Sequence, residues 1–182
     1  MNNNDTTSFS VVYDSFLSKI TDDMYMELTK EDTYKMLQDL LVSSIPKFEF
    51  PRFNIFDYEL GTEISVETED EEGNIIVTNE YKVGYFNSIL TQEEINIIAT
   101  YMIVEWLGQQ LASIENIRMK YSGTDFKFTS QANHMQKLLT LKKDYEREGF
   151  HLQRLYKRRA PGKDGLPKST LDIIMAPLKK RG

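Results

Sequence analysis

Residues 91–107 read TQEEINIIATYMIVEWL, and this segment determines where the core of the protein lies. It opens with Thr-x-x-Glu at Thr91 and Glu94, a capping box in which each side chain binds the backbone N–H of the other residue. Ten of the thirteen residues from Ile95 to Leu107 are apolar or aromatic. A helix that is apolar nearly all round is a buried helix. We therefore expect a central helix that begins after Thr91 and continues to about Tyr121.

Amphipathic helices are predicted on both sides of this segment. Apolar residues recur at helical spacing from Ser10 to Ile20, and a second helix begins after the N-cap Thr29 and ends at Pro46. A long helix is expected from about Ser130 to Arg158. Its apolar seam, interrupted by Glu148, consists of Leu138, Leu141, Tyr145, Leu152 and Leu155. The predicted fold class is therefore mainly α, a small helical bundle around the buried central helix.

Residues 57–86 have a different pattern. Apolar and polar residues alternate from Thr62 to Thr68 and again from Ile75 to Tyr85, which is the period of a β-strand. Between Arg52 and Lys82 the chain has nine acidic residues and no basic one. We predict an inserted β-hairpin that leans on the helices or on a partner, because an isolated hairpin is marginal in water. Its acidic tip contains Glu69, Asp70, Glu71 and Glu72.

Both ends of the chain are predicted to be extended arms, residues 1–9 and residues 159–182, on a domain of residues 10–158. The net charge is −6, yet the residues from Lys157 to Gly182 include eight Lys or Arg and two Asp, so the preceding part carries −12. Such asymmetry is typical of an interaction tail. The predicted partner-binding residues are Lys157, Arg158, Arg159, Leu171, Ile173, Ile174, Lys179, Lys180 and Arg181.

The sequence offers little support for catalysis or metal binding. With no cysteine, disulfides, thiolate ligands and a cysteine nucleophile are excluded. His134 and His151 lie on the same predicted helix, about 25 Å apart at ~1.5 Å per residue, too far to share a metal ion. Glu105, in the apolar helix, is expected to pair with a basic residue or face an interface. We predict a protein that is not an enzyme and has no cofactor and no metal.

No membrane segment is predicted either. The N-terminal residues are polar and lack the character of a signal peptide. The most apolar stretch, Ile95 to Leu107, is shorter than the ~20 residues that a bilayer requires and contains Glu105.

Two stretches resemble a known family. The segment Ile97–Leu107, IIATYMIVEWL, is similar to the central helix of the head–tail connector proteins of tailed bacteriophages, also called adaptor or neck ring proteins. The segment Phe126–His134, FKFTSQANH, is similar to the residues that precede their long helix. The order of predicted elements over roughly residues 10–158 resembles the same family, whereas the hairpin at residues 57–86 goes beyond its smallest members.

The resemblance implies a structural virion protein of the head–tail junction, made in the host cytoplasm. It implies a homo-oligomeric ring, typically a dodecamer, that joins the portal protein to other neck and tail proteins and continues the DNA channel. In that family the C-terminal arm often reaches into the portal, so Lys157, Arg158 and Arg159 are expected to contact it. DNA would pass without specific binding, because an acidic lining repels phosphates, and Glu69–Glu72 would then face the channel, solvent or the tail side.

Three alternatives remain open from the residues alone. The basic C-terminal arm also fits a nucleic-acid-binding packaging or regulatory factor, whose affinity would fall steeply with salt. The other two are an enzyme whose site is not evident in the sequence and a helical scaffold of an unrelated complex.

Overall fold

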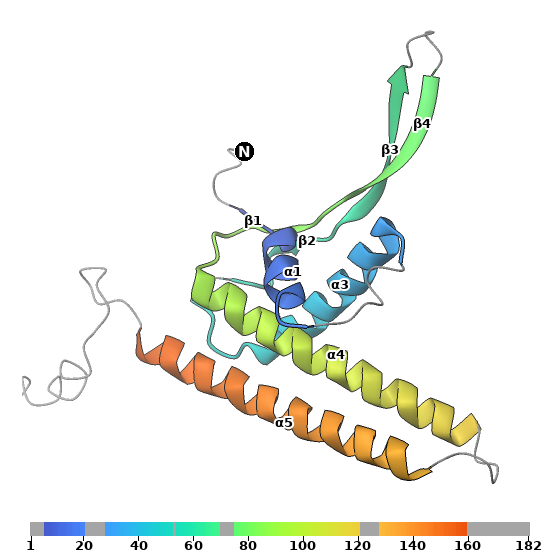
Figure 1. Cartoon of the computed structure of the whole chain (residues 1–182). Coiled ribbons are helices and arrows are strands. Elements are labelled where there is room, and N and C mark those ends of the chain that lie inside the picture. The colour runs from blue at the N-terminus through green and yellow to red at the C-terminus, as the bar shows by residue number, and fades with distance from the viewer. Residues whose placement is uncertain (1–5, 21–27, 53, 70–74, 121–127, 160–182) are drawn as a thin grey trace, which may run out of the picture.

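The computed structural model describes residues 6–20, 28–52, 54–69, 75–120 and 128–159 (Figure 1). Over these residues the protein is mostly helical, with a small amount of β-structure, as predicted. The helices are α1 (Phe9–Leu17), α3 (Lys30–Ser44), α4 (Gln92–Lys120), α5 (Phe128–Arg158) and the short 3-10 helix η1 (Ile45–Lys47). The strands are β1 (Thr7–Ser8), β2 (Tyr58–Glu59), β3 (Thr62–Glu69), β4 (Ile75–Lys82) and β5 (Tyr85–Phe86).

Helix α4 lies between α1 and α3 on one side and α5 on the other (Figure 1). All residues from Ile97 to Val104 are buried, as expected for a helix that is apolar all round. The predicted capping box is present at its start. Glu94 Oε2 accepts hydrogen bonds from the Thr91 backbone N at 2.7 Å and the Thr91 hydroxyl at 2.8 Å, while the Glu94 backbone N donates to Thr91 Oγ1 at 3.3 Å.

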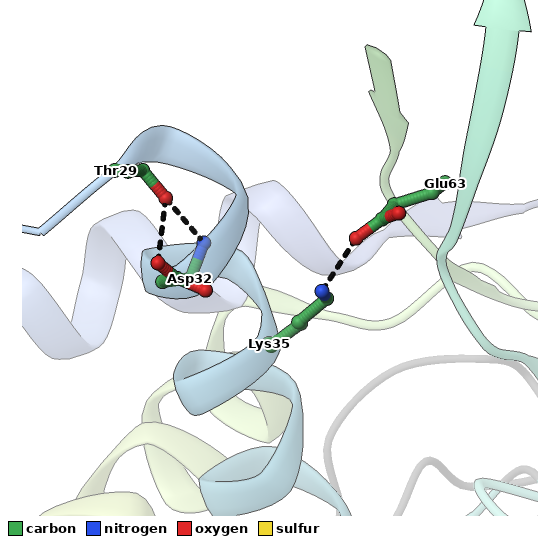
Figure 2. A network of polar contacts seen from close by, with 4 residues as sticks. All are labelled: Thr29, Asp32, Lys35 and Glu63. Atoms are coloured by element: carbon green, nitrogen blue, oxygen red, sulfur yellow. Dashed lines mark hydrogen bonds and ion pairs between the residues drawn. The ribbon is translucent and has the colours of Figure 1, made fainter. Parts of the chain in front are cut away.

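Side-chain caps also fix the starts of α1 and α3. The Ser8 hydroxyl accepts from the backbone N of Ser10 at 3.3 Å. At α3, Thr29 Oγ1 accepts from the Asp32 backbone N at 3.1 Å and donates to the Asp32 carboxylate at 2.8 Å (Figure 2). The predicted N-cap Thr29 is thus confirmed, and Pro46 follows the helix inside η1.

The hairpin is present, but it is divided into two parts. Strands β3 and β4 pair antiparallel from Thr62↔Lys82 to Glu69↔Ile75, and β2 pairs with β5 in the same register beyond a break. Gly61 and Gly84 lie at this break: a Cβ on Gly61 would come within 2.6 Å of the Lys82 carbonyl oxygen, and one on Gly84 within 2.3 Å of the Glu59 oxygen. The two glycines therefore permit a close approach of the chains that no other residue allows.

Two sequence expectations need correction. Residues 7–9 do not belong to an N-terminal arm, because β1 pairs with β5 (Thr7↔Phe86) and Phe9 begins α1 as a fully buried core residue. Leu141 does not belong to a buried seam, since 43% of it is exposed. The remaining parts of the predicted arms, residues 1–5 and 160–182, lie outside the described residues.

Helix α5 packs against α4 through a close contact at Gly149. A Cβ at this position would lie 2.7 Å from Cζ of Tyr101 on α4, inside the minimum distance of real contacts. The absence of a side chain at Gly149 therefore sets how near the two helices come. The polar residues Gln153 and Tyr156 follow along α5 and are both buried.

Candidate functional site

The C-terminal end of α5 forms a basic surface that the body of the protein holds in place. Lys157, Arg158 and Arg159 are all exposed. The Lys157 ammonium lies 4.0 Å from the ring centroid of Phe50, a cation–π contact. Arg159 forms an ion pair with Glu93, which stands in the first turn of α4. Although the prediction placed Arg159 in the arm, this residue contacts the body, and its backbone N donates to the Leu155 oxygen at 3.0 Å.

A buried tyrosine, Tyr156, attaches this basic end of α5 to the core. The Tyr156 side chain is 1% exposed, and its hydroxyl donates to Glu94 Oε1 and accepts from the Arg52 backbone N at 3.2 Å. The Arg52 guanidinium lies 4.1 Å above the Tyr156 ring and donates to the Tyr156 carbonyl oxygen at 2.9 Å. Burial, followed by the bond to the Glu94 carboxylate, raises the pKa of the Tyr156 hydroxyl well above its ordinary value.

One turn earlier, Gln153 fastens α5 to the connector that follows α3. Its Nε2 donates to the Lys47 oxygen at 2.9 Å and to the Tyr101 hydroxyl at 2.5 Å, and its Oε1 accepts from the Glu49 backbone N at 2.8 Å. The Gln153 side chain itself is buried, with 2% exposed, and its bond to Tyr101 lies in the core. The direction of the last turns of α5 is therefore set by the core.

The hairpin forms the second candidate surface, on the far side of α4 from α5 (Figure 1). Its root is attached to α3 by three contacts. The Tyr34 and Tyr81 rings stack with centroids 5.4 Å apart, the Gln38 side chain accepts from the Gly61 backbone N at 2.7 Å, and Lys35 pairs with Glu63 at 2.5 Å (Figure 2). The hydrogen bond to Glu63 raises the pKa of Lys35.

Beyond this root the hairpin presents apolar side chains to solvent. The exposed fractions are 65% for Ile75 and 58% for Val77, with Ile64 on the other face at 38%. The predicted tip residues Asp70, Glu71 and Glu72 lie outside the described residues. Glu69 is the last residue of β3. The described part of the hairpin therefore leans on α3 only at its base.

The structure assigns Glu105 the role of an ion-pair partner. Its carboxylate lies 2.5 Å from the Lys47 ammonium, and its side chain is 27% exposed. The expectation that Glu105 pairs with a basic residue is confirmed. The fully buried carboxylate of the described core is instead Glu94, which the sequence identified as a cap but not as the partner of Tyr156.

The described residues form two grooves on the surface of the body. A groove of about 350 Å³ lies between α1 and α3, where Asp14 and Lys30 are among the lining residues, and one of about 260 Å³ lies beside Tyr101 and Phe150. Within the described residues no group of three or more His, Asp or Glu side chains is arranged to hold a metal ion. His134 and His151 are exposed on α5.

The predicted arm residues Leu171, Ile173, Ile174, Lys179, Lys180 and Arg181 lie outside the described residues, so the geometry joins only Lys157, Arg158 and Arg159 into one surface. Sequence reasoning missed Arg52, Phe50, Gln153 and Tyr156. The sequence did contain a signal for Gln153 and Tyr156. The connector between Pro46 and Pro51 has backbone N–H and C=O groups that no helix or sheet pairs, and such groups, when buried, require a hydrogen-bond partner from elsewhere in the chain.

No family model, curated protein or solved structure matches this chain. Among the described helices none combines the length and apolar character needed to cross a membrane.

Proposed function

We propose that this protein is a structural component of a phage virion, a ring that joins the portal of the head to the tail and continues the DNA channel. The observation that carries the proposal is the separation of charge between two surfaces. An exposed basic surface ends α5, and an acidic hairpin stands on the opposite side of α4. The resemblance of the α4 sequence to the central helix of head–tail connectors supports the same assignment.

Each surface has a property that the proposed role requires. The basic end of α5 is held by Tyr156 and Gln153, so a portal or a neighbouring subunit would meet charges that are already oriented. The strands of the hairpin contain Glu63, Glu67, Glu69 and Glu80 against a single basic residue, Lys82. Such a surface repels the phosphates of DNA, which suits a channel that conducts DNA without retaining it.

The proposal is tested by the sedimentation of the protein in a nuclease-treated lysate of its native source. A virion component is expected to travel with particles of virion size and to remain with them after the nucleic acid is digested. If the protein stays in small soluble fractions, the connector assignment is refuted.

A second candidate function, nucleic-acid binding, is favoured by the run Lys157, Arg158 and Arg159. If these residues neutralise phosphates, the logarithm of the affinity for duplex DNA falls with the logarithm of the salt concentration, with a slope near −0.9 per contact. Replacing all three by Gln then makes that slope less negative by about 3. A connector shows no such binding at physiological salt, so a salt titration of the purified chain separates the two functions.

A further inference from the structure

The outer half of the β3–β4 hairpin is an apolar surface that the described part of the chain does not cover. Tyr81 packs on Tyr34 at the root, but farther along the same face of β4 Val77 and Ile75 are 58% and 65% exposed. A two-stranded sheet without a covered face is marginal in water. A hairpin of this length therefore gains most from a partner that covers Val77 and Ile75.

The charge of the hairpin decides what kind of partner fits. On the face of Val77, the cross-strand neighbour is Glu67, and Glu63 lies nearer the root. Glu80 occupies the opposite face, and Lys82 is the sole basic residue in the sequence of the two strands. A second hairpin or a nucleic acid would bring like charges together. The surface fits a basic segment that also carries aliphatic side chains.

Such a segment exists in this chain, at residues 160–182. It has five Lys or Arg against two Asp, and it contains the aliphatic group Leu171, Ile173 and Ile174. The charge of the segment and the charge of the hairpin are therefore complementary. The hairpin side of such a pairing would offer the exposed aliphatic side chains of Ile75 and Val77.

The end of α5, where the segment begins, and the hairpin are attached to different parts of the body. The end of α5 is tied to the start of α4 through Arg159 and Glu93, whereas the hairpin is tied to α3 through Lys35 and Glu63. Figure 1 shows these two features on opposite sides of α4. Two different surfaces that bind each other between copies make a head-to-tail contact, which forms a ring when the rotation between copies closes and an open filament when it does not.

We propose that residues 160–182 of one copy bind the outer half of the β3–β4 hairpin of the next copy, covering Ile75 and Val77. This inference rests on the ring of the proposed function and names the contact that links its neighbouring subunits. The basic arm then binds a neighbouring subunit within the ring.

Disulfide trapping tests the contact, because the natural chain has no cysteine. Full-length Val77→Cys and Ile173→Cys variants are mixed and oxidised mildly, and the products are separated without reduction. Docking brings the two thiols to about millimolar local concentration against micromolar protein in solution, so their disulfide should form on the order of a thousandfold faster than a control disulfide. The matched control pairs Ile173→Cys with Thr140→Cys, an exposed position on α5.

Sedimentation velocity of the unmodified chain is measured alongside, so that the two proposals can fail separately. If rings form but Val77→Cys reacts no faster than Thr140→Cys, the arm–hairpin contact is refuted and the ring is not. If the double variant Val77→Cys/Ile173→Cys closes only within single chains, the segment binds its own hairpin and the contact between copies is refuted. A chain that neither assembles nor cross-links at any concentration refutes both.

A charge exchange provides the second measurement. Replacing Glu67 and Glu69, the cross-strand neighbours of Val77 and Ile75, by Lys should reduce trapping at Val77→Cys to the level of the control, and replacing Lys179, Lys180 and Arg181 by Glu in the Ile173→Cys chain should restore it. Failure of the restoration, with both variants folded by circular dichroism, overturns the charge complementarity on which the proposal depends.

Discussion

Two buried tyrosines allow the polar network beneath the basic surface to be measured against a control within the same chain. Tyr156 and Tyr13 are 1% and 2% exposed, and replacing either by Phe removes one hydroxyl from a buried site. The Tyr156 hydroxyl bonds to Glu94 and Arg52, whereas the Tyr13 hydroxyl has no hydrogen-bond partner among the described residues. We therefore expect the two substitutions to have opposite signs.

The magnitude follows from the bonds that each substitution removes. A hydrogen bond to a charged group contributes about 1.5–3 kcal/mol and one between neutral groups about 1 kcal/mol. Tyr156→Phe loses one of each and leaves the Glu94 carboxylate, which is fully buried, with one partner fewer. Its expected cost is about 3 kcal/mol. Tyr13→Phe removes a hydroxyl that is buried and has no hydrogen-bond partner among the described residues, so it should stabilise the protein by up to about 1 kcal/mol.

Urea denaturation at a fixed protein concentration measures both effects. With a slope of about 2 kcal/mol per molar urea, Tyr156→Phe should lower the midpoint by roughly 1.5 M and Tyr13→Phe should leave it unchanged or raise it. The protein concentration is held constant because assembly would add to the apparent stability. If Tyr156→Phe costs no more than Tyr13→Phe, the hydroxyl of Tyr156 does not support the end of α5, and the reasoning is wrong.

Three further predictions concern the fold. Gly149→Ala should destabilise the protein by about 1–3 kcal/mol, because the added Cβ would lie 2.7 Å from Tyr101. Gly108→Ala should stabilise it by up to ~1 kcal/mol through helix propensity, because the added Cβ would lie 3.6 Å from Lys142, an ordinary contact distance. Thermal unfolding of the two variants measures both effects. Thr91→Ala should cost about 1 kcal/mol in the same assay by removing the cap of α4, and an unchanged midpoint would contradict the cap. Burial raises the pKa of the Tyr13 and Tyr156 hydroxyls in the folded state above the value in the unfolded chain. The contribution of these neutral hydroxyls to the free energy of unfolding is therefore complete below about pH 10 and is lost as the pH rises further. The melting temperature should fall above that pH, and it should fall less steeply in Tyr13→Phe.

The local signals in the sequence predicted the helices well. Thr91 with Glu94 and Thr29 with Asp32 are short-range patterns, because a cap needs only residues within one turn. The apolar run after Ile95 is also a local pattern. Because apolar residues occur on all sides of this helix, no side of it suits solvent, and the run therefore predicted burial. The hairpin also followed from alternation, and its register agrees with the two predicted runs.

What the sequence did not predict depends on contacts between distant residues. Tyr156 meets Arg52 across 104 positions, and no period or composition indicates that pairing. The strand β1 was assigned to an arm because two residues are too few to show alternation, yet β5 supplies the partner that makes them a strand. Leu141 is exposed because the face of α5 that packs on the core lies one position further along, at Lys142, Gly149 and Tyr156, and the sequence pattern does not distinguish the two positions.

The position of the basic surface is a consequence of the core rather than of α5 alone. Glu94 caps α4 with one carboxylate oxygen and accepts from Tyr156 with the other, so one side chain joins the start of α4 to the end of α5. Arg159 and Glu93 repeat that connection at the surface. An exposed ion pair of this kind contributes little stability, so of these two connections the one between Glu94 and Tyr156 contributes more. It follows that a substitution at Glu94 would reorient Lys157 and Arg158 without touching either of them, and loss of partner binding in such a variant would show that their orientation matters as well as their charge.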